Sequence, residues 1–209
     1  MKCLIIVGGG GLGKEVVWLA KECGRKVFGI LDDSSDKKDS LVQGVRRIGG
    51  VLDWTKYPSC DFIIAIGSPR TRLNVLSKME SLGKPSFATL IHPDVKFSDT
   101  VQFGCGSIIF PGSILTSDVV VGEHNIVNSN STIAHDCSFG NFVTIAPMVA
   151  ISGNVVLENL VEVGTGAAVR QGLTISEGGM LGMGAVLTKS VPERTVFVGN
   201  PAKKLKEIS

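Results

Sequence analysis

The sequence is poor in aromatic residues, net charge and long apolar runs, and each shortage excludes a class of protein. Aromatic residues make up 6% of the 209, with one tyrosine and two tryptophans. Lysine and arginine number 21 against 19 aspartates and glutamates, and they are scattered along the chain, so we expect no nucleic-acid partner. No apolar run approaches the ~20 residues that cross a membrane, so we expect no membrane insertion.

Cysteine is present in an odd number, five, and no two cysteines form a CxxC pair. This usage is typical of reduced, mostly buried thiols in a cytoplasmic protein. We therefore expect five free thiols and a cytoplasmic location. The apolar start of the chain resembles a signal peptide only superficially, because the glycines of residues 8–13 and the charges of Lys14 and Glu15 interrupt it.

The second half of the chain has a six-residue period. Every sixth residue from Ile91 to Leu187 is apolar, and Glu193 breaks the series. At 44% apolar composition, chance would produce this run roughly once in a million trials. The residues two positions before each of these are mostly small or β-branched. The period suits neither an amphipathic helix nor a hairpin, and it predicts short parallel strands stacked coil on coil.

The first half predicts an α/β domain instead. A buried-strand run at 3–7 meets a run of glycines, an amphipathic stretch follows, and a second strand at 26–31 ends on an acidic pair. A third strand at 61–66 leads into a helix near 71–82, and the polar stretch Ser34–Asp39 is expected to be a solvated loop. We therefore predict a Rossmann-like domain over residues 1–88, with room for about four strands, and an all-β domain over residues 89–209.

A glycine motif lies where this first domain would bind a ligand. Gly8, Gly10 and Gly13 satisfy GxGxxG between a strand and a helix, where backbone N–H groups can hold a phosphate. An acidic pair about twenty residues later could hold a ribose or a base. A tight turn without a ligand is the alternative. The expected acceptor-binding residues are Gly8, Gly10, Gly11, Gly13, Asp32, Asp33 and Gly67.

The short length of this domain argues against a dehydrogenase. A full dinucleotide-binding fold has two mononucleotide halves, and only one fits here. A domain with one mononucleotide-binding half is expected to bind a single nucleotide, or a sugar carried on a nucleotide. A small NAD-dependent dehydrogenase remains an alternative.

His135 is the strongest candidate for catalysis among three histidines. It precedes Asp136 in a segment rich in hydrogen-bonding side chains, two residues after the inward Ile133, and should point outward near a coil corner. A neutral imidazole can accept a proton from a nucleophile near neutral pH. The local pattern alone leaves a solvated surface histidine as the alternative.

The other two histidines have simpler interpretations. His92 precedes Pro93 and is expected to cap the start of the coil, and His124 is expected on a solvated corner. Neither lies in coil register with His135, so we expect no three-histidine zinc site and no metal.

Five segments carry a resemblance to a known family: residues 5–14, Ala65-Ile66-Gly67, Ala134–Cys137, Ser152–Val155 and Val198–Lys203. Together they resemble the left-handed β-helix acetyltransferases that modify sugars. These include the bacillosamine-pathway N-acetyltransferases, which act on UDP-4-amino sugars, and the sialic acid O-acetyltransferases. The resemblance covers essentially the whole chain. It implies a left-handed parallel β-helix of hexapeptide repeats, three to a coil, with a C-terminal cap.

The resemblance also implies a reaction, acetyl transfer from acetyl-CoA in a homotrimer whose sites lie between neighbouring β-helices. His135 matches the family's general base, Asp136 its acidic neighbour and Asn128 an asparagine seven residues earlier. Gly153 matches a glycine whose N–H approaches the thioester carbonyl. The residues expected to contact acetyl-CoA are Thr144, Gly153, Gly164, Gly182 and Lys203.

The chain departs from the family at two positions. Thr144 stands where the bacillosamine enzymes have a second histidine, and Leu12 stands where the glycine turn often carries one. At eighteen residues per coil, Gly153 stacks on His135, whereas Thr144 lies half a turn away. Asn128 lies close to Thr144 in coil register. His135, Gly153, Asn128 and Thr144 can therefore serve one site only if two chains contribute.

We expect N-acetylation of a nucleotide-linked amino sugar, of the UDP-4-amino-sugar type, in surface glycan synthesis. O-acetylation of sialic acid or a related sugar is one alternative. A non-catalytic scaffold that binds nucleotide sugars is another, from a different class.

Overall fold

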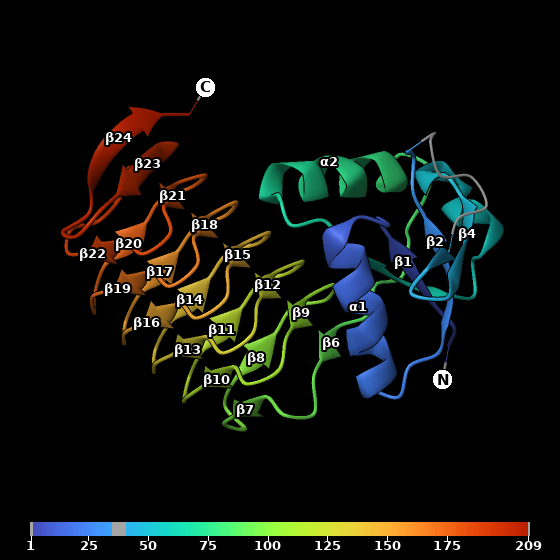
Figure 1. The fold of residues 1–209 in the computed structure, drawn as a ribbon, viewed down its shortest axis with the longest axis horizontal. Helices are drawn as coiled ribbons and strands as arrows, with labels where there is room; N and C mark the ends of the chain where they lie inside the picture. The colour runs from blue at the N-terminus through green and yellow to red at the C-terminus, as the bar shows by residue number, and fades with distance from the viewer. Residues whose placement is uncertain (1, 35–40, 209) are drawn as a thin grey trace. The chain divides into compact units, whose positions relative to one another are not determined.

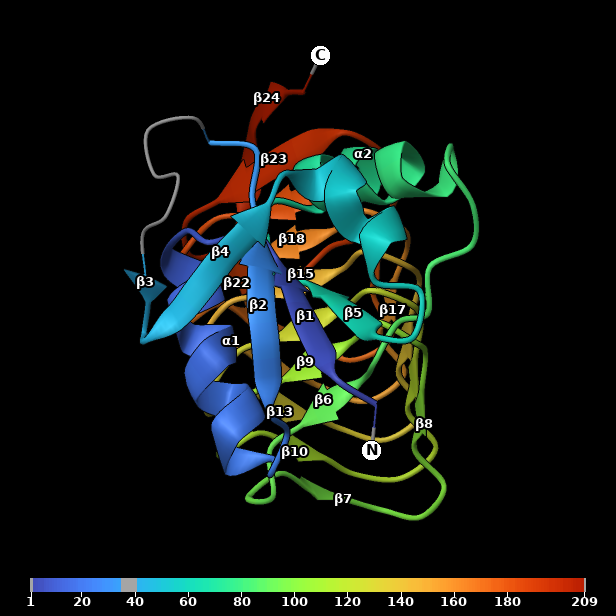
Figure 2. The same ribbon diagram turned by 90° about the vertical axis from the view of Figure 1, so that its right-hand side faces the viewer.

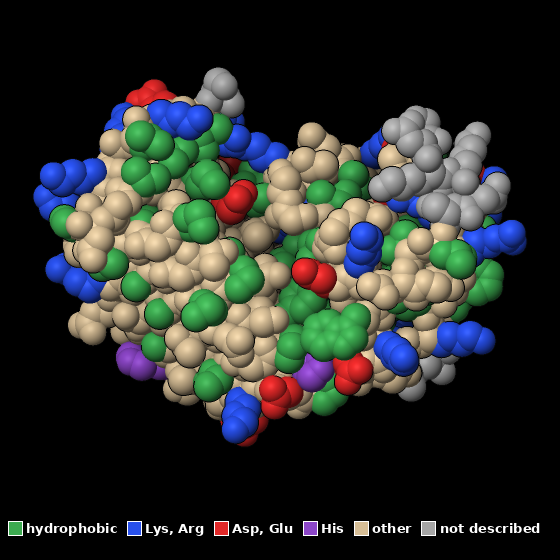
Figure 3. Space-filling view, in the orientation of Figure 1, with side chains coloured by type: hydrophobic (Ala, Val, Ile, Leu, Met, Phe, Trp, Pro, Cys, Tyr) green, Lys and Arg blue, Asp and Glu red, His purple; other side chains and the backbone are tan. Residues whose placement is uncertain are grey.

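The computed structural model describes residues 2–34 and 41–208, so only Ser34 of the loop expected at Ser34–Asp39 lies within the described residues. The chain forms two compact units, Met1–Leu90 and Ile91–Ser209. Within the described ranges, no helix has both the length and the apolar character that a membrane span requires. On the face shown in Figure 3, lysine and arginine side chains are scattered among other residues and form no single patch.

The first unit is an α/β domain built on a five-stranded sheet. Its elements are β1 (Leu4–Val7), α1 (Gly11–Glu22), β2 (Val27–Leu31), β3 (Leu41–Val42), β4 (Val45–Gly49), the 3₁₀ helix η2 (Val51–Lys56), β5 (Asp61–Ile64) and α2 (Pro69–Glu80). The strand order is β3-β4-β2-β1-β5, and all pairs are parallel except the β3–β4 hairpin (Figures 1 and 2). The Rossmann-like fold predicted for this part of the chain is confirmed.

The β3–β4 hairpin makes the sheet one strand wider than the four predicted. Its loop is the dipeptide Gln43-Gly44, and both residues have positive φ, 50° and 80°. This is the backbone of a two-residue hairpin turn whose twist matches that of the flanking strands. Asn-Gly and Asp-Gly are the usual sequence signals of a two-residue hairpin turn, and Gln-Gly is not. The hairpin was therefore not predicted from the sequence.

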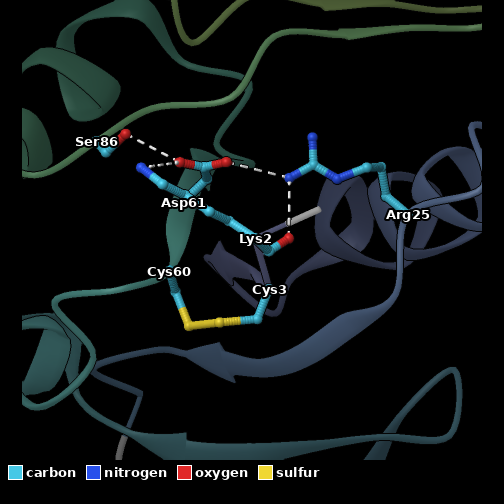
Figure 4. Close-up of a disulfide and its surroundings, with 6 residues drawn as sticks. All are labelled: Lys2, Cys3, Arg25, Cys60, Asp61 and Ser86. Carbon is cyan, nitrogen blue, oxygen red and sulfur yellow. Dashed lines mark hydrogen bonds and ion pairs between the residues drawn. A yellow bond between two sulfur atoms is a disulfide. The ribbon is translucent and has the colours of Figure 1, made fainter.

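The prediction of five free thiols is wrong for two cysteines, because Cys3 and Cys60 form a disulfide (Figure 4). These residues precede β1 and β5, and the parallel register that pairs Leu4 with Asp61 brings their Cα atoms to 4.8 Å. A separation of 57 residues hides this pairing in the sequence. Cys23, Cys105 and Cys137 take no part in a disulfide.

The second unit is a left-handed parallel β-helix of mostly two-residue strands, which form three sheets. One sheet contains β6 (Leu90–Ile91), β9 (Ile108–Ile109), β12 (Ile126–Val127), β15 (Thr144–Ile145), β18 (Glu162–Val163), β21 (Met180–Leu181), β23 (Thr195–Val198) and β24 (Lys203–Glu207). The second contains β7 (Lys96–Phe97), β10 (Ile114–Leu115), β13 (Thr132–Ile133), β16 (Ala150–Ile151), β19 (Ala168–Val169) and β22 (Val186–Leu187). The third contains β8 (Gln102–Phe103), β11 (Val120–Val121), β14 (Ser138–Phe139), β17 (Val156–Leu157) and β20 (Thr174–Ile175).

The register of these sheets explains the six-residue period. Leu115 pairs with Ile133 and Ile133 with Ile151, so each coil takes eighteen residues and three strands (Figure 1). Every residue of the apolar series from Ile109 to Leu187 is buried. The coil predicted from the period is therefore confirmed over this range.

The series is less buried where the coil begins. Phe97 is 47% exposed, and Ile91 and Phe103 are only partly buried. Strands β7 and β8 lie at the ends of their sheets, so each has a neighbouring strand on one side only. Phe97 and Phe103 pack edge to face instead, with ring centroids 5.2 Å apart.

Hydrogen bonds between coils explain the small residues two positions before the apolar ones. Side chains at these positions donate to a carbonyl fifteen residues later: Ser107 to Gly122, Ser113 to Asn128, Ser131 to Ala146 and Cys137 to Ser152. Each bond satisfies a backbone oxygen where the chain turns a corner.

Candidate active site

His135 and Asp136 lie on a corner of the β-helix, between β13 and β14. Asp136 has a φ of 58°, in the left-handed region that Asp and Asn tolerate better than most residues. This turn brings its carboxylate to His135, with Oδ2 2.7 Å from Nδ1. In a regular strand the two side chains would point to opposite faces. A carboxylate bound to Nδ1 favours the tautomer whose Nε2 can accept a proton.

Gly153 lies one coil beyond His135, and the imidazole ring packs directly on it. A Cβ atom at position 153 would lie 2.7 Å from Cε1 of His135 and 2.8 Å from Nε2. The His135 carbonyl accepts a hydrogen bond from Asn154 N–H at 2.9 Å, which fixes the stacking of the two coils. The structure thus brings together three of the predicted site residues, and the glycine is required here by close approach.

Asn128 and Thr144 lie on another part of the same β-helix. Asn128 follows β12 and donates from Nδ2 to the Ile145 carbonyl at 2.7 Å, and Thr144 is buried in β15. Strands β12 and β15 belong to the eight-stranded sheet. His135 instead lies at the corner between the six-stranded sheet, which contains β13, and the five-stranded sheet, which contains β14. One chain therefore does not bring these two residues together with His135.

The three remaining residues predicted to contact acetyl-CoA lie further along the coil. A Cβ at Gly164 would lie 2.5 Å from Met183 N, and one at Gly182 would lie 2.7 Å from Cγ1 of Val198. Tight packing between coils therefore already accounts for both glycines. Lys203 is exposed on β24. Contacts of these residues with acetyl-CoA stay a prediction.

The glycine motif forms one wall of a cavity of about 380 Å³ in the first unit. Gly8 has a φ of 105°, and a Cβ at Gly13 would clash with the Gly8 carbonyl oxygen, so the turn needs glycine at both positions. Gly10 is the N-cap of α1, and no atom lies within 4 Å of the position a Cβ would take there. Six of the seven predicted acceptor-binding residues line the cavity: Gly8, Gly10, Gly11, Asp32, Asp33 and Gly67.

Both aspartates of this cavity are engaged by protein groups. Asp32 accepts hydrogen bonds from Gly9 N–H and from Ser34, and Asp33 binds Val51 N–H at 2.7 Å and Nζ of Lys78 at 2.6 Å. Burial raises the pKa of Asp32, but the hydrogen bonds from Ser34 and Gly9 and the charge of Arg47 together hold that pKa below its usual value. The hydrogen bond from Lys78 is the main cause of the lowered pKa of Asp33. Both carboxylates are therefore ionised at neutral pH.

Sequence reasoning missed the cations behind this cavity. Arg47, buried on β4, lies 3.1 Å from Asp32, and the fully buried Arg72 donates to the Gly67 carbonyl at 3.0 Å. A second cavity of about 660 Å³ shares Asp32 and Asp33 and is lined also by Arg47. The only signal in the sequence was the Arg46–Arg47 pair, which could not be placed without the β3–β4 hairpin.

The other two histidines have structural roles. Nδ1 of His92 accepts a hydrogen bond from Asp94 N–H at 3.0 Å, so the prediction of a capping residue is confirmed. The prediction of a solvated corner for His124 is wrong. Its side chain is 2% exposed and stacks on Phe142 one coil away, with centroids 5.2 Å apart and an interplanar angle of 10°.

Comparisons of the sequence and of the structure with known proteins agree on one family. Residues 3–79 match the PglD N-terminal domain. The chain is 30% identical to the GDP-perosamine N-acetyltransferase of Escherichia coli O157:H7 over 96% of its own length and 95% of the relative's.

Two solved structures are similar over nearly the whole fold. PerB from Caulobacter crescentus, in complex with CoA and GDP-perosamine, has a TM-score of 0.90 and 29% identity, covering 99% of this chain and 98% of that one. The acetyltransferase domain of PglB from Neisseria gonorrhoeae, in complex with acetyl-CoA, has a TM-score of 0.90 and 33% identity, covering 98% and 99%. With a glycine turn, a hexapeptide β-helix and a full-length relative at 30% identity, the chain belongs to the hexapeptide-repeat sugar N-acetyltransferase family.

Proposed function

We propose that this protein transfers the acetyl group of acetyl-CoA to the amino group of a nucleotide-linked sugar. The observation that carries the proposal is the full-length similarity to PerB, whose structure holds CoA and GDP-perosamine together. The cavity beside the glycine turn would bind the nucleotide-linked acceptor, because backbone N–H groups at the start of α1 suit a diphosphate.

His135 would act as the general base of this reaction. As the amine attacks the thioester carbonyl carbon, a C–N bond forms and the amine proton passes to Nε2. Asp136, 2.7 Å from Nδ1, stabilises the imidazolium that results. The C–S bond then breaks, and the CoA thiolate takes the proton from His135. The Gly153 N–H is assigned to the oxyanion that develops on the carbonyl oxygen.

The site would be shared between copies of the chain in a homotrimer. Asn128 and Thr144 lie on a different side of the β-helix from His135, so only a second chain can bring them to the reacting atoms. A nucleotide-linked product is an activated sugar donor, which places the reaction before glycosyl transfer in surface glycan synthesis. Since the reaction draws on acetyl-CoA, we assign it to the cytoplasm.

The direct test is acetyl-CoA consumption against UDP-, GDP- and dTDP-linked amino sugars, with free and CMP-linked sialic acid as hydroxyl acceptors. Turnover with a nucleotide-linked amino sugar is the expected result. Turnover with sialic acid alone would make the protein an O-acetyltransferase, and binding of acetyl-CoA without turnover on any sugar would make it a scaffold.

The glycine turn offers a second test, the variant Gly10→Val. Since a Cβ at position 10 would meet no atom within 4 Å, the variant should fold normally while its side chain obstructs the approach of a phosphate. We expect a raised KM for the nucleotide sugar and an unchanged KM for acetyl-CoA, measured by steady-state kinetics. An unchanged KM for the sugar would show that the turn holds no ligand.

A further inference from the structure

Three neighbouring strands send groups to one point behind the glycine turn. Arg47 comes from β4, Asp32 follows β2 and Gly9 follows β1, and these strands are adjacent in the order β4-β2-β1. Nη1 of Arg47 lies 3.1 Å from Oδ1 of Asp32 and donates to Oγ of Ser34 at 2.7 Å. The other oxygen of Asp32 accepts the N–H of Gly9. A continuous set of polar contacts therefore runs from β4 to the turn.

The guanidinium group of Arg47 lies directly against the turn. A Cβ at Gly9 would be 2.7 Å from Nη2 of Arg47 and 3.0 Å from Oδ2 of Asp32. Arg47 is only 7% exposed, so it is buried where an unpaired charge would be costly. The turn thus rests on an ion pair.

This arrangement matters for a negatively charged ligand. Asp32 is ionised and bound to the turn that faces the cavity, where its charge alone would repel a diphosphate. The charge of Arg47 opposes this repulsion and leaves the N-terminus of α1 as the net positive element at the cavity.

We propose that Arg47 is a positioning residue for the diphosphate of the acceptor: it neutralises Asp32 and holds it against Gly9, so that the glycine turn presents its N–H groups to an anion. This inference rests on the proposed function and adds a residue that acts through Asp32 without touching the reacting atoms.

The chain offers a matched control in the pair of Arg25 and Asp61. These side chains are 3.3 Å apart and 17% and 18% exposed, and they lie at the other end of the parallel strands (Figure 4). Asp61 is the first residue of β5, whereas Asp32 follows the last residue of β2. Arg25→Met therefore removes a comparable ion pair of the same domain far from the cavity.

The experiment compares Arg47→Met, Arg47→Lys and Arg25→Met with the unmodified protein. Calorimetry gives the Kd of UDP and GDP, and steady-state kinetics give kcat and KM. Arg47→Met should raise the Kd of the tighter nucleotide and the KM of the nucleotide sugar by roughly 10- to 100-fold, as expected for a lost charge-assisted contact. The kcat and the KM for acetyl-CoA should stay within a factor of about 2, because the reacting groups are unchanged. Arg47→Lys should recover part of the affinity, and Arg25→Met should match the unmodified protein.

A double-mutant cycle separates this role from a loss of folding. In Arg47→Met/Asp32→Asn no uncompensated buried charge remains, so this variant should fold and bind the nucleotide more tightly than Arg47→Met. A double variant that binds no better, or an Arg47→Met protein with unchanged Kd and KM, would overturn the role of Arg47. An unmodified protein that neither binds UDP or GDP nor acetylates any nucleotide-linked amino sugar would instead overturn the proposed function.

Discussion

One left-handed residue determines how the imidazole of His135 is held. The φ of 58° at Asp136 turns the chain so that adjacent side chains meet, with Nδ1 and Oδ2 2.7 Å apart. Both side chains remain more than half exposed, 57% and 54%, so a substrate can reach them. The pair is therefore oriented by the backbone and remains accessible.

Replacement of His135 by alanine should abolish general base catalysis while leaving the coil intact. We expect kcat to fall roughly 10²–10⁴-fold, with the Kd of acetyl-CoA nearly unchanged. His92→Asn is the control, because asparagine can still accept the hydrogen bond from Asp94 N–H. Equal losses in the two variants would refute the assignment of the base.

Gly153→Ala tests the contact beneath the imidazole. The new Cβ would lie 2.7 Å from Cε1 of His135, which is too close for both atoms to stay in place. Since the imidazole ring is exposed, it can move away from the new methyl group. Misplacement of a catalytic group by a fraction of an ångström predicts a loss of kcat of about 10-fold, with little change in the melting temperature. In a His135→Ala background the same substitution should cost nothing further, because alanine keeps the N–H assigned to the oxyanion. A further loss would indicate that the added methyl group displaces the substrate itself.

Sequence reasoning singled out some residues of this candidate site and overlooked others. His135 was a candidate because a carboxylate lies beside it in the sequence, and its catalytic role stays a prediction. Arg47 was missed because its importance comes from a contact across two strands, with Asp32, that no local pattern encodes. The burial of His124 depends on Phe142, eighteen residues away, which a prediction from adjacent residues could not include.

At the scale of elements, the coil corners carry side chains in register from one coil to the next. His124 and Phe142 occupy equivalent positions, with φ of 53° and 60°, and stack nearly parallel. Gly106 lies one coil earlier, and a Cβ there would press on the His124 ring. The corner is therefore a packed column of side chains.

His124→Ala should destabilise this column without affecting catalysis. Loss of a buried ring that stacks on Phe142 should cost about 1–3 kcal/mol of the free energy of unfolding. Thermal and urea denaturation measure this loss, and Glu123→Ala, which truncates an exposed neighbouring side chain, should leave stability unchanged. A stable His124→Ala protein with impaired kcat would mean that this histidine takes part in the reaction.

The elements also differ in how well their patterns predict them. The β-helix repeats one rule many times, so each apolar residue reinforces the same inference. The β3–β4 hairpin occurs once, with an unusual Gln-Gly turn, and its two-residue first strand carries almost no periodic signal. The disulfide of Cys3 and Cys60 depends on the register of β1 with β5, which only the assembled sheet defines.

At the scale of the whole molecule, the proposed shared site predicts an assembly of several copies of the chain. Outward-facing apolar residues, Ile114, Val120 and Val156, are 41%, 43% and 39% exposed on the β-helix and could be covered by neighbouring copies. Light scattering should give about three times 22.0 kDa. A monomer that retains full activity would contradict the shared site.

A mixing experiment would test the same model through catalysis. If His135 and Asn128 of one site belong to different chains, His135→Ala and Asn128→Ala each inactivate every site in their own trimers. Trimers reassembled from both variants would contain sites with neither substitution, so activity should return after mixing. No recovery would place both residues in a site formed by one chain.

The hairpin of β23 and β24 has a consequence for solubility. A parallel coil has an open end, which could accept another strand and grow into a fibre. Strand β24 pairs antiparallel with β23, and all five of its residues are exposed. Three of them are lysines, Lys203, Lys204 and Lys206, whose like charges repel an incoming copy of the same edge. The β23–β24 hairpin thus disfavours the growth of fibres from the open end of this repetitive fold.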